Sequence, residues 1–213
     1  MVGDEHIVPE FRKLLEGYAR FRTDHYASER ARWEALAEGQ EPPVMIIACC
    51  DSRVDPATIF DTQPGQAFVL RNVANLVPPF EQGGGLHGAS AAIEFGVTGL
   101  GVRHIVVIGH GACGGITAAL DGHDHDGPQS FVDSWISILD EPRAQIMADP
   151  SIEDKQYALE LAAVRQSLLN LRTFPFVAQR EAAAELSLHG CHFAIAEGRL
   201  SVLDEAENGF RPV

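Results

Sequence analysis

The stretch VMIIACCDSR, residues 44–53, is a continuous apolar run that ends in two cysteines, a carboxylate and an arginine. Short apolar runs bounded by turn signals are typical of buried strands in a parallel sheet. The same pattern recurs in HIVVIG, residues 104–109, and QAFVLRN, residues 66–72, predicts a further strand after the turn QPGQ. Two of these strands run directly into segments with chemically active side chains, CCDSR and HGACGG.

Segments with a helical spacing of apolar residues surround these strands. Residues 10–38 predict one or two amphipathic helices, residues 88–101 a helix rich in small residues, and residues 131–186 mainly helix interrupted by prolines. HFAIA, residues 192–196, and LSVLD, residues 200–204, predict a late strand pair. The alternation predicts an α/β fold with a mainly parallel central sheet of about four to five strands flanked by helices. In such sheets the functional residues lie beyond the carboxyl ends of the strands.

Length and charge limit the possible classes of protein. The 213 residues predict a single domain over residues 1–213, with residues 1–38 as a helical arm. The formal net charge of -14 argues against nucleic-acid partners and anionic membranes. The chain contains no apolar run of about 18 residues that could span a membrane. Residues 1–10 lack the apolar core of a secretory signal, so we expect a cytoplasmic protein whose four cysteines are thiols or metal ligands.

The segment CCDSR brings a thiol, a carboxylate and a guanidinium together at a strand end. Side chains alternate along a strand, so Cys49 and Asp51 should share one face while Cys50 points away. Arg53 can hold the carboxylate of Asp51 with a two-pronged hydrogen bond, which orients it and lowers its pKa. On this segment alone, a buried cysteine followed by a turn salt bridge is an equally good interpretation.

The segment HGACGG places His110 three residues before Cys113. At the first turn of a helix this spacing puts both side chains on one side, and the helix N-terminus favours the thiolate of Cys113. With one distant cysteine, these residues make a Cys2His set, the pattern of a catalytic zinc with an open fourth position. The alternative is a polar turn over a helix start. Because both segments end buried strands, we expect them to converge in space.

Two further patterns in this region allow other interpretations. Gly109, Gly111 and Gly114 spell the dinucleotide-binding fingerprint, but the strand that should follow and end in an acidic residue is absent. The tract HDHD, residues 123–126, could attract a metal ion. Its flanking glycines and proline favour a solvated loop.

Four motifs in order resemble the β-class carbonic anhydrases, in particular their plant-type branch: ACCDSR, RNVANLVPP, AAIEF and GHGACGG. The resemblance implies zinc-dependent, reversible hydration of CO2 to bicarbonate and a proton, by attack of zinc-bound hydroxide on CO2. It implies that Cys49, not Cys50, joins His110 and Cys113 around one zinc ion per subunit. It leaves hydrolysis of carbonyl sulfide or carbon disulfide on the same scaffold as an alternative function. A non-catalytic zinc-binding protein is a more distant alternative.

The resemblance also implies roles for residues around the metal. Asp51 and Arg53 would form a catalytic dyad. The N-terminal helices would extend over a partner subunit, giving a homodimer or homotetramer. Phe95 stands where that branch commonly carries tyrosine. The residues implied to line the cleft for CO2 and bicarbonate are Gln40, Phe68, Val73 and Phe95.

Overall fold

The computed structural model describes residues 8–82, 87–122 and 130–213. Within the chain, two compact units are distinguished, Met1–Gln40 and Glu41–Val213. The tract HDHD at residues 123–126 lies outside the described residues, so its interpretation as a loop stays a prediction. In the described part of the chain, every helix is too short or too polar to cross a membrane.

The smaller unit consists of helices whose aromatic side chains contact one another. The ring of Trp33 lies 5.3 Å from that of Phe21 and 6.0 Å from that of Tyr26, measured between centroids. One side of the first helix exposes the apolar residues Phe11, Leu14, Leu15 and Tyr18. The elements are α1 (Pro9–Arg20), the π-helical segment η2 (Phe21–Tyr26) and α2 (Arg30–Glu38).

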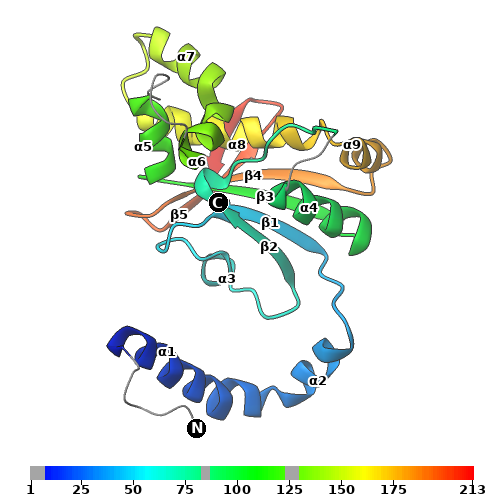
Figure 1. Cartoon of the computed structure of the whole chain (residues 1–213). Coiled ribbons are helices and arrows are strands. Elements are labelled where there is room, and N and C mark those ends of the chain that lie inside the picture. Colours follow the sequence, from blue (N-terminus) through cyan, green and yellow to red (C-terminus); the bar gives the residue numbers. More distant parts are fainter. Residues whose placement is uncertain (1–7, 83–86, 123–129) are drawn as a thin grey trace. The chain divides into compact units, whose positions relative to one another are not determined.

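The larger unit is built on one six-stranded sheet in the order β2-β1-β3-β4-β5-β6. The first four strands in this order are parallel, and β5 and β6 continue the sheet in antiparallel pairs (Figure 1). The mainly parallel α/β sheet is therefore confirmed. Its strands are β1 (Val44–Cys49), β2 (Ala67–Asn72), β3 (His104–His110), β4 (Ser187–Ala194), β5 (Arg199–Asp204) and β6 (Gly209–Pro212).

The structure corrects two details of the predicted sheet. It has six strands, where the sequence predicted four to five, because the terminal segment Gly209–Pro212 pairs with β5. A four-residue strand that ends in proline is too short to show an alternating pattern. Strand β4 begins at Ser187, five residues before the predicted start at His192. Its first half, SLHGC, has no apolar run, and its pairing with β3 gives it an extended conformation.

Helices cover the two faces of the sheet unequally. The face that carries Met45 and Ile47 of β1 packs against helices α4, α8 and α9 in the largest apolar cluster. The opposite face has a smaller cluster around Ile46 and Ile108, which includes Phe60 at the end of α3. The helical elements are α3 (Pro56–Ile59), η3 (Val73–Asn75), α4 (Gly88–Glu94), η4 (Phe95–Gly99), α5 (Gly114–Asp121), α6 (Phe131–Ile136), η5 (Ser137–Leu139), α7 (Asp140–Ala148), α8 (Lys155–Leu171) and α9 (Pro175–Ala182).

The strand register brings the predicted functional segments to one edge of the sheet. Cys49, the last residue of β1, is opposite Asn72, the last residue of β2. On the other side of β1, β3 runs parallel and extends to His110. Because the carboxyl ends of parallel strands meet at the same edge, CCDSR and HGACGG emerge side by side.

Candidate metal centre

Cys49 and Cys50 point to opposite sides of the strand end, as alternation along β1 predicts. Cys49 is buried, with 4% of its surface exposed, and packs in the apolar cluster under α5 and α8. Cys50 is exposed. All four cysteines of the chain are free thiols in the structure. Only the first of the two adjacent cysteines is therefore directed into the interior where a metal could be enclosed.

His110 and Cys113 approach one another through a tight turn, which corrects the prediction that both lie on one helical turn. His110 is still part of β3, because it pairs with Phe193 of β4. Ala112 then adopts a left-handed conformation with φ of 54°, and Cys113 caps the start of α5. The N–H of Gly111 donates to the carbonyl oxygen of Phe193 at 3.0 Å and holds the turn on the sheet.

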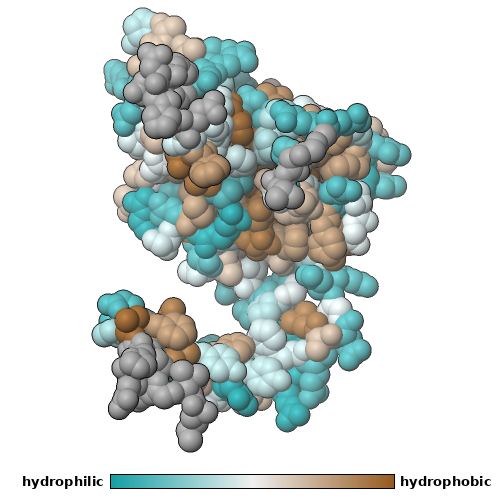
Figure 2. All heavy atoms as spheres, in the orientation of Figure 1, coloured by the Kyte–Doolittle hydropathy of each residue, from teal (hydrophilic) through white to brown (hydrophobic). Residues whose placement is uncertain are grey.

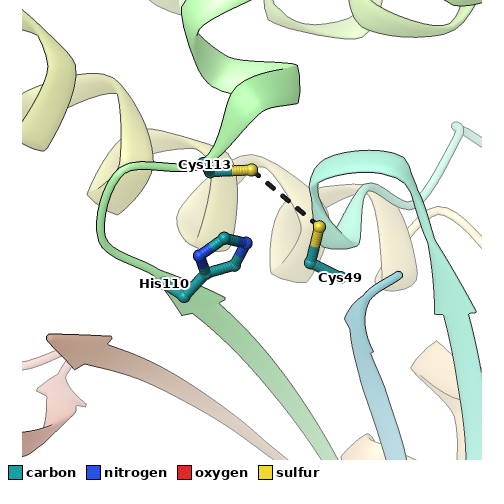
Figure 3. A group of neighbouring side chains, drawn as sticks. All are labelled: Cys49, His110 and Cys113. Atoms are coloured by element: carbon teal, nitrogen blue, oxygen red, sulfur yellow. Dashed lines mark hydrogen bonds between the residues drawn. The ribbon is translucent and has the colours of Figure 1, made fainter. Parts of the chain in front are cut away.

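The three side chains form one buried cluster (Figure 3). The two Sγ atoms and a ring nitrogen of His110 all lie within 4.8 Å of one another. The sulfurs of Cys49 and Cys113 are 3.9 Å apart. Two sulfurs at about 2.3 Å from a tetrahedral zinc ion would lie about 3.8 Å apart, so this spacing suits zinc. Among the described residues, this is the group of three or more potential metal ligands that the structure brings together.

The hydrogen bonds of His110 also suit a metal ligand. Its Nδ1 lies 3.0 Å from the carbonyl oxygen of Gly111, which fixes the proton on Nδ1 when the ring is neutral. The other nitrogen, Nε2, is buried and has no hydrogen-bond partner among the described residues. A buried nitrogen without a partner is costly in a stable protein. A metal ion bound at Nε2 would satisfy it.

The two cysteines share a proton when no metal is bound. A hydrogen bond from the Cys113 thiol lowers the pKa of Cys49, and the same hydrogen bond raises the pKa of Cys113. Backbone N–H groups of Asp51 and Ala74 also stabilise the Cys49 thiolate. Burial opposes the charge on His110, but the proximity of the Cys49 sulfur, the bond to the Gly111 carbonyl and the nearby charge of Asp51 together raise the pKa of its imidazole.

Asp51 and Arg53 form a two-pronged ion pair beside the cluster. Arg53 donates from Nε to Oδ1 at 2.9 Å and from Nη2 to Oδ2 at 2.7 Å. These bonds hold the pKa of Asp51 well below its usual range. The Oδ2 atom of Asp51 lies 4.0 Å from Nε2 of His110, so the carboxylate is on the same side as the free ring nitrogen.

The structure places the four predicted cleft residues in different surroundings. Val73 directly follows β2 and packs against the cluster that contains Cys49 and Cys113. Phe68 and Phe95 contact each other, with ring centroids 5.9 Å apart. Phe68 precedes the end of β2 by four residues, about 13 Å along the strand from the metal ligands. Gln40 is the last residue of the other compact unit.

A buried pair on α8 and β4 lies behind Cys113 and was not predicted from the sequence. The carboxylate of Glu160 accepts from the Cys113 N–H at 3.3 Å and from Gln156 at 2.8 Å, and its other oxygen lies 3.0 Å from Nε2 of His192. Both side chains are at most 3% exposed. A glutamate one helical turn before the buried Val164, on an otherwise apolar stripe, is the sequence signal that marks such a group.

The fold and the site define a class of protein: a mainly parallel α/β domain with a three-ligand metal cluster at the carboxyl ends of its strands. A family model described as carbonic anhydrase matches residues 44–200. "Beta carbonic anhydrase 3" of Arabidopsis thaliana is 34% identical over 200 residues, which cover 92% of this chain and 77% of that protein. The mitochondrial "Beta carbonic anhydrase 6" of the same plant is 36% identical over 189 residues, 87% of this chain and 64% of that protein.

Solved structures agree with the family match. The β-carbonic anhydrase CcaA has a TM-score of 0.89 and 31% identity, covering 96% of this chain and 100% of that chain. A structure from tetrameric β-carbonic anhydrases of Sordaria macrospora has a TM-score of 0.78 and 28% identity, covering 92% and 98%. The chain belongs to the β-class carbonic anhydrase family.

Proposed function

We propose that this enzyme catalyses the reversible hydration of CO2 to bicarbonate and a proton at a zinc ion held by Cys49, His110 and Cys113. The buried Nε2 of His110, unpartnered among the described residues and close to the two sulfurs, is the observation that carries the proposal. When bound, zinc acts as a Lewis acid that makes water acidic enough to serve as a nucleophile near neutral pH. Three protein ligands leave the fourth position open for this chemistry.

Asp51 orients the nucleophile in this proposal. Arg53 engages both carboxylate oxygens and holds the pKa of Asp51 well below its usual range, so the carboxylate stays ionised near neutral pH. An ionised carboxylate only accepts hydrogen bonds. The O–H of the nucleophile would donate a hydrogen bond to Oδ2 of Asp51. In that orientation a lone pair on the oxygen of the nucleophile is free to attack the carbon of CO2.

The remaining cleft residues point to an assembly of identical chains. Phe68 lies about 13 Å along β2 from the metal ligands of its own chain, and Phe95 is 52% exposed. Figure 2 shows apolar side chains gathered on the side of the sheet that carries β1 and β2. We propose that Phe68, Phe95 and Gln40 line the cleft of a second copy, in a homodimer or homotetramer. The relatives from Sordaria macrospora are described as tetrameric.

The test is stopped-flow CO2 hydration with protein whose zinc content has been measured, compared with Asp51→Asn. Asparagine keeps the size of the side chain but removes the charge, so zinc should stay bound while turnover falls by about a hundredfold or more. Full activity of Asp51→Asn would contradict the role of the dyad. Wild-type protein that lacks stoichiometric zinc, or that turns over carbonyl sulfide faster than CO2, would contradict the proposed reaction.

A further inference from the structure

The segment between β1 and α3, residues 50–55, carries both members of the dyad and has no helical or strand structure. Backbone bonds hold it at its start and in its middle. The N–H of Cys50 donates to the carbonyl oxygen of Asn72 at 2.8 Å, and the N–H of Val54 donates to that of Asp51 at 3.2 Å. Without the regular ladder of a sheet or helix, its conformation depends on further contacts from outside the segment.

The guanidinium of Arg71 supplies these contacts from the neighbouring strand. Arg71 lies on β2, opposite Ala48 of β1. Its Nε donates to the carbonyl oxygen of Cys49 at 2.9 Å. Its Nη2 donates to the carbonyl oxygen of Asp51 at 2.7 Å and to that of Val54 at 3.1 Å. Carbonyl groups spread over residues 49–54 therefore converge on one planar side chain, and the segment is wound around it.

A further contact joins Arg71 to the start of α3. Its Nη1 lies 3.1 Å from Oδ2 of Asp55, the N-cap residue of that helix, whose Oδ1 accepts from the N–H of Thr58 at 3.1 Å. Arginine carries five N–H donors in a rigid planar fork, so it can serve acceptors in several directions at once. Lysine has a single nitrogen and cannot reproduce this arrangement.

Two arginines thus fix different parts of Asp51. Arg53 holds the carboxylate, and Arg71 holds the carbonyl oxygen of the same residue. Their side chains are 49% and 29% exposed, so Arg71 is the more enclosed of the two. A carboxylate is only as well placed as the backbone that carries it. Loss of the contacts from Arg71 would therefore displace the carboxylate even though Arg53 stays in place.

We propose that Arg71 is a positioning residue, which acts through Asp51 by fixing the backbone between β1 and α3. This proposal rests on the proposed function, in which Asp51 orients the nucleophile. Arg71 is not assigned contact with the reacting atoms, because its bonds go to backbone carbonyl groups and to Asp55. A displacement of about 1 Å from the productive geometry can lower a rate about a hundredfold.

The test is a double-mutant cycle between Arg71→Lys and Asp51→Asn, measured as kcat/KM for CO2 hydration per bound zinc ion. Lysine keeps the charge and removes the fork. We expect Arg71→Lys to lower kcat/KM at least about tenfold in the otherwise wild-type chain. In the Asp51→Asn background we expect a loss of less than about twofold, because the residue through which Arg71 acts is already disabled. Zinc content should stay at one ion per chain in all variants.

Arg211→Lys is the control for this cycle. It makes the same substitution in an exposed ion pair with Asp204 and should leave kcat/KM unchanged. Equal losses from Arg71→Lys in the two backgrounds would indicate a general structural role and overturn the proposal. Unchanged kcat/KM in Arg71→Lys would also overturn it. Loss of zinc from Arg71→Lys would do so too, because the residue would then act on the ligand Cys49.

Asp55→Asn keeps the proposal falsifiable if Arg71→Lys does not fold. Asparagine is as good an N-cap as aspartate, so α3 stays capped while the charge that holds Nη1 of Arg71 is removed. We expect kcat/KM to fall roughly threefold, the size of effect typical of an exposed ion pair. Asp154→Asn makes the same change at the N-cap of α8 and should have no effect. Equal kcat/KM in the two variants would overturn the proposal.

The two proposals fail in different ways. If Asp51→Asn alone keeps full kcat/KM, the role of the dyad in the proposed function is wrong. If Asp51→Asn loses activity and neither Arg71→Lys nor Asp55→Asn does, the proposed function stands and the positioning role of Arg71 is wrong.

Discussion

The guanidinium of Arg53 donates a hydrogen bond to the carbonyl oxygen of Ala112 at 2.9 Å. The same Nη2 atom also bonds to Asp51, so one side chain ties the carboxylate to the turn between two candidate metal ligands. Displacement of that turn would move the carboxylate and the ligands together. The dyad is therefore part of the support of the metal site as well as a chemical group beside it.

Arg53→Ala should change how stability depends on pH. The folded pKa of Asp51 is depressed, so its contribution to stability is complete above the unfolded value of about 3.9 and is lost as pH falls through the lower folded pKa. Without Arg53 the pKa of Asp51 in the folded protein approaches its unfolded value. The free energy of unfolding should then fall less steeply with decreasing pH below about pH 4. Urea unfolding of the metal-free protein at a series of pH values in this acidic range measures the change in slope. Arg199→Ala removes an exposed ion pair with Glu197 and should leave the profile unchanged.

The adjacent cysteines make a second matched pair. Cys49→Ala removes a buried candidate ligand, whereas Cys50→Ala removes an exposed thiol one residue away. Zinc affinity should fall by more than about a hundredfold in Cys49→Ala, which exceeds the usual loss for a residue that only supports a ligand. Metal analysis after dialysis should find one zinc ion per chain in Cys50→Ala and almost none in Cys49→Ala or Cys113→Ala. Stoichiometric zinc in Cys49→Ala would show that the ligand assignment is wrong.

Zinc binding should release protons in a predictable order. The hydrogen bond from Cys113 lowers the pKa of Cys49, so the thiol pair holds mainly one proton near neutral pH, and zinc displaces it. Below the raised pKa of His110 a second proton must leave the imidazole. Affinity should therefore fall about tenfold for each unit of decreasing pH, and more steeply below the pKa of His110. Competition titrations with a chelator across neutral pH test this slope, and an affinity independent of pH would contradict it.

Glu160→Ala should destabilise the metal-free protein strongly. It leaves Nε2 of His192 and the N–H of Cys113 buried without their hydrogen-bond partner, and each unsatisfied buried group costs about 1–3 kcal/mol. Glu197→Ala removes a glutamate from an exposed pair with Arg199 and should cost at most about 1 kcal/mol. Denaturant unfolding of the two variants compares them directly. A similar loss in both would mean that the pair with His192 contributes little to stability.

Local sequence was sufficient to predict the central strands and the side of the strand on which Cys49 lies. The apolar runs at β1 and β3 lie within the segments that pair, Val44–Ala48 with His104–Ile108, and alternation along β1 separates Cys49 from Cys50. The convergence of CCDSR and HGACGG followed from parallel strands that end at one edge. These features depend on neighbouring residues, so the sequence contains them directly.

The parts that sequence could not predict depend on distant contacts. The strand conformation of His110 comes from its pairing with Phe193, and it displaced the predicted helical turn. The left-handed Ala74 follows from no local preference of alanine. It depends in part on a bond from Trp135 to Val73, 62 positions apart in sequence. The burial of Glu160 likewise requires His192, which belongs to a strand whose first half has no apolar pattern.

The position of the metal ligands within the sheet also bears on the thermodynamics of metal loading. Parallel pairing of β1 with β3, from Val44 opposite His104 to Ala48 opposite Ile108, brings Cys49 and His110 together through backbone bonds alone. In small zinc-dependent domains the metal must order the chain, and binding energy is folding energy. Here the sheet has already ordered the ligands, so most of the zinc–ligand free energy remains as affinity. The metal-free form should consequently be a folded protein that is ready to be loaded.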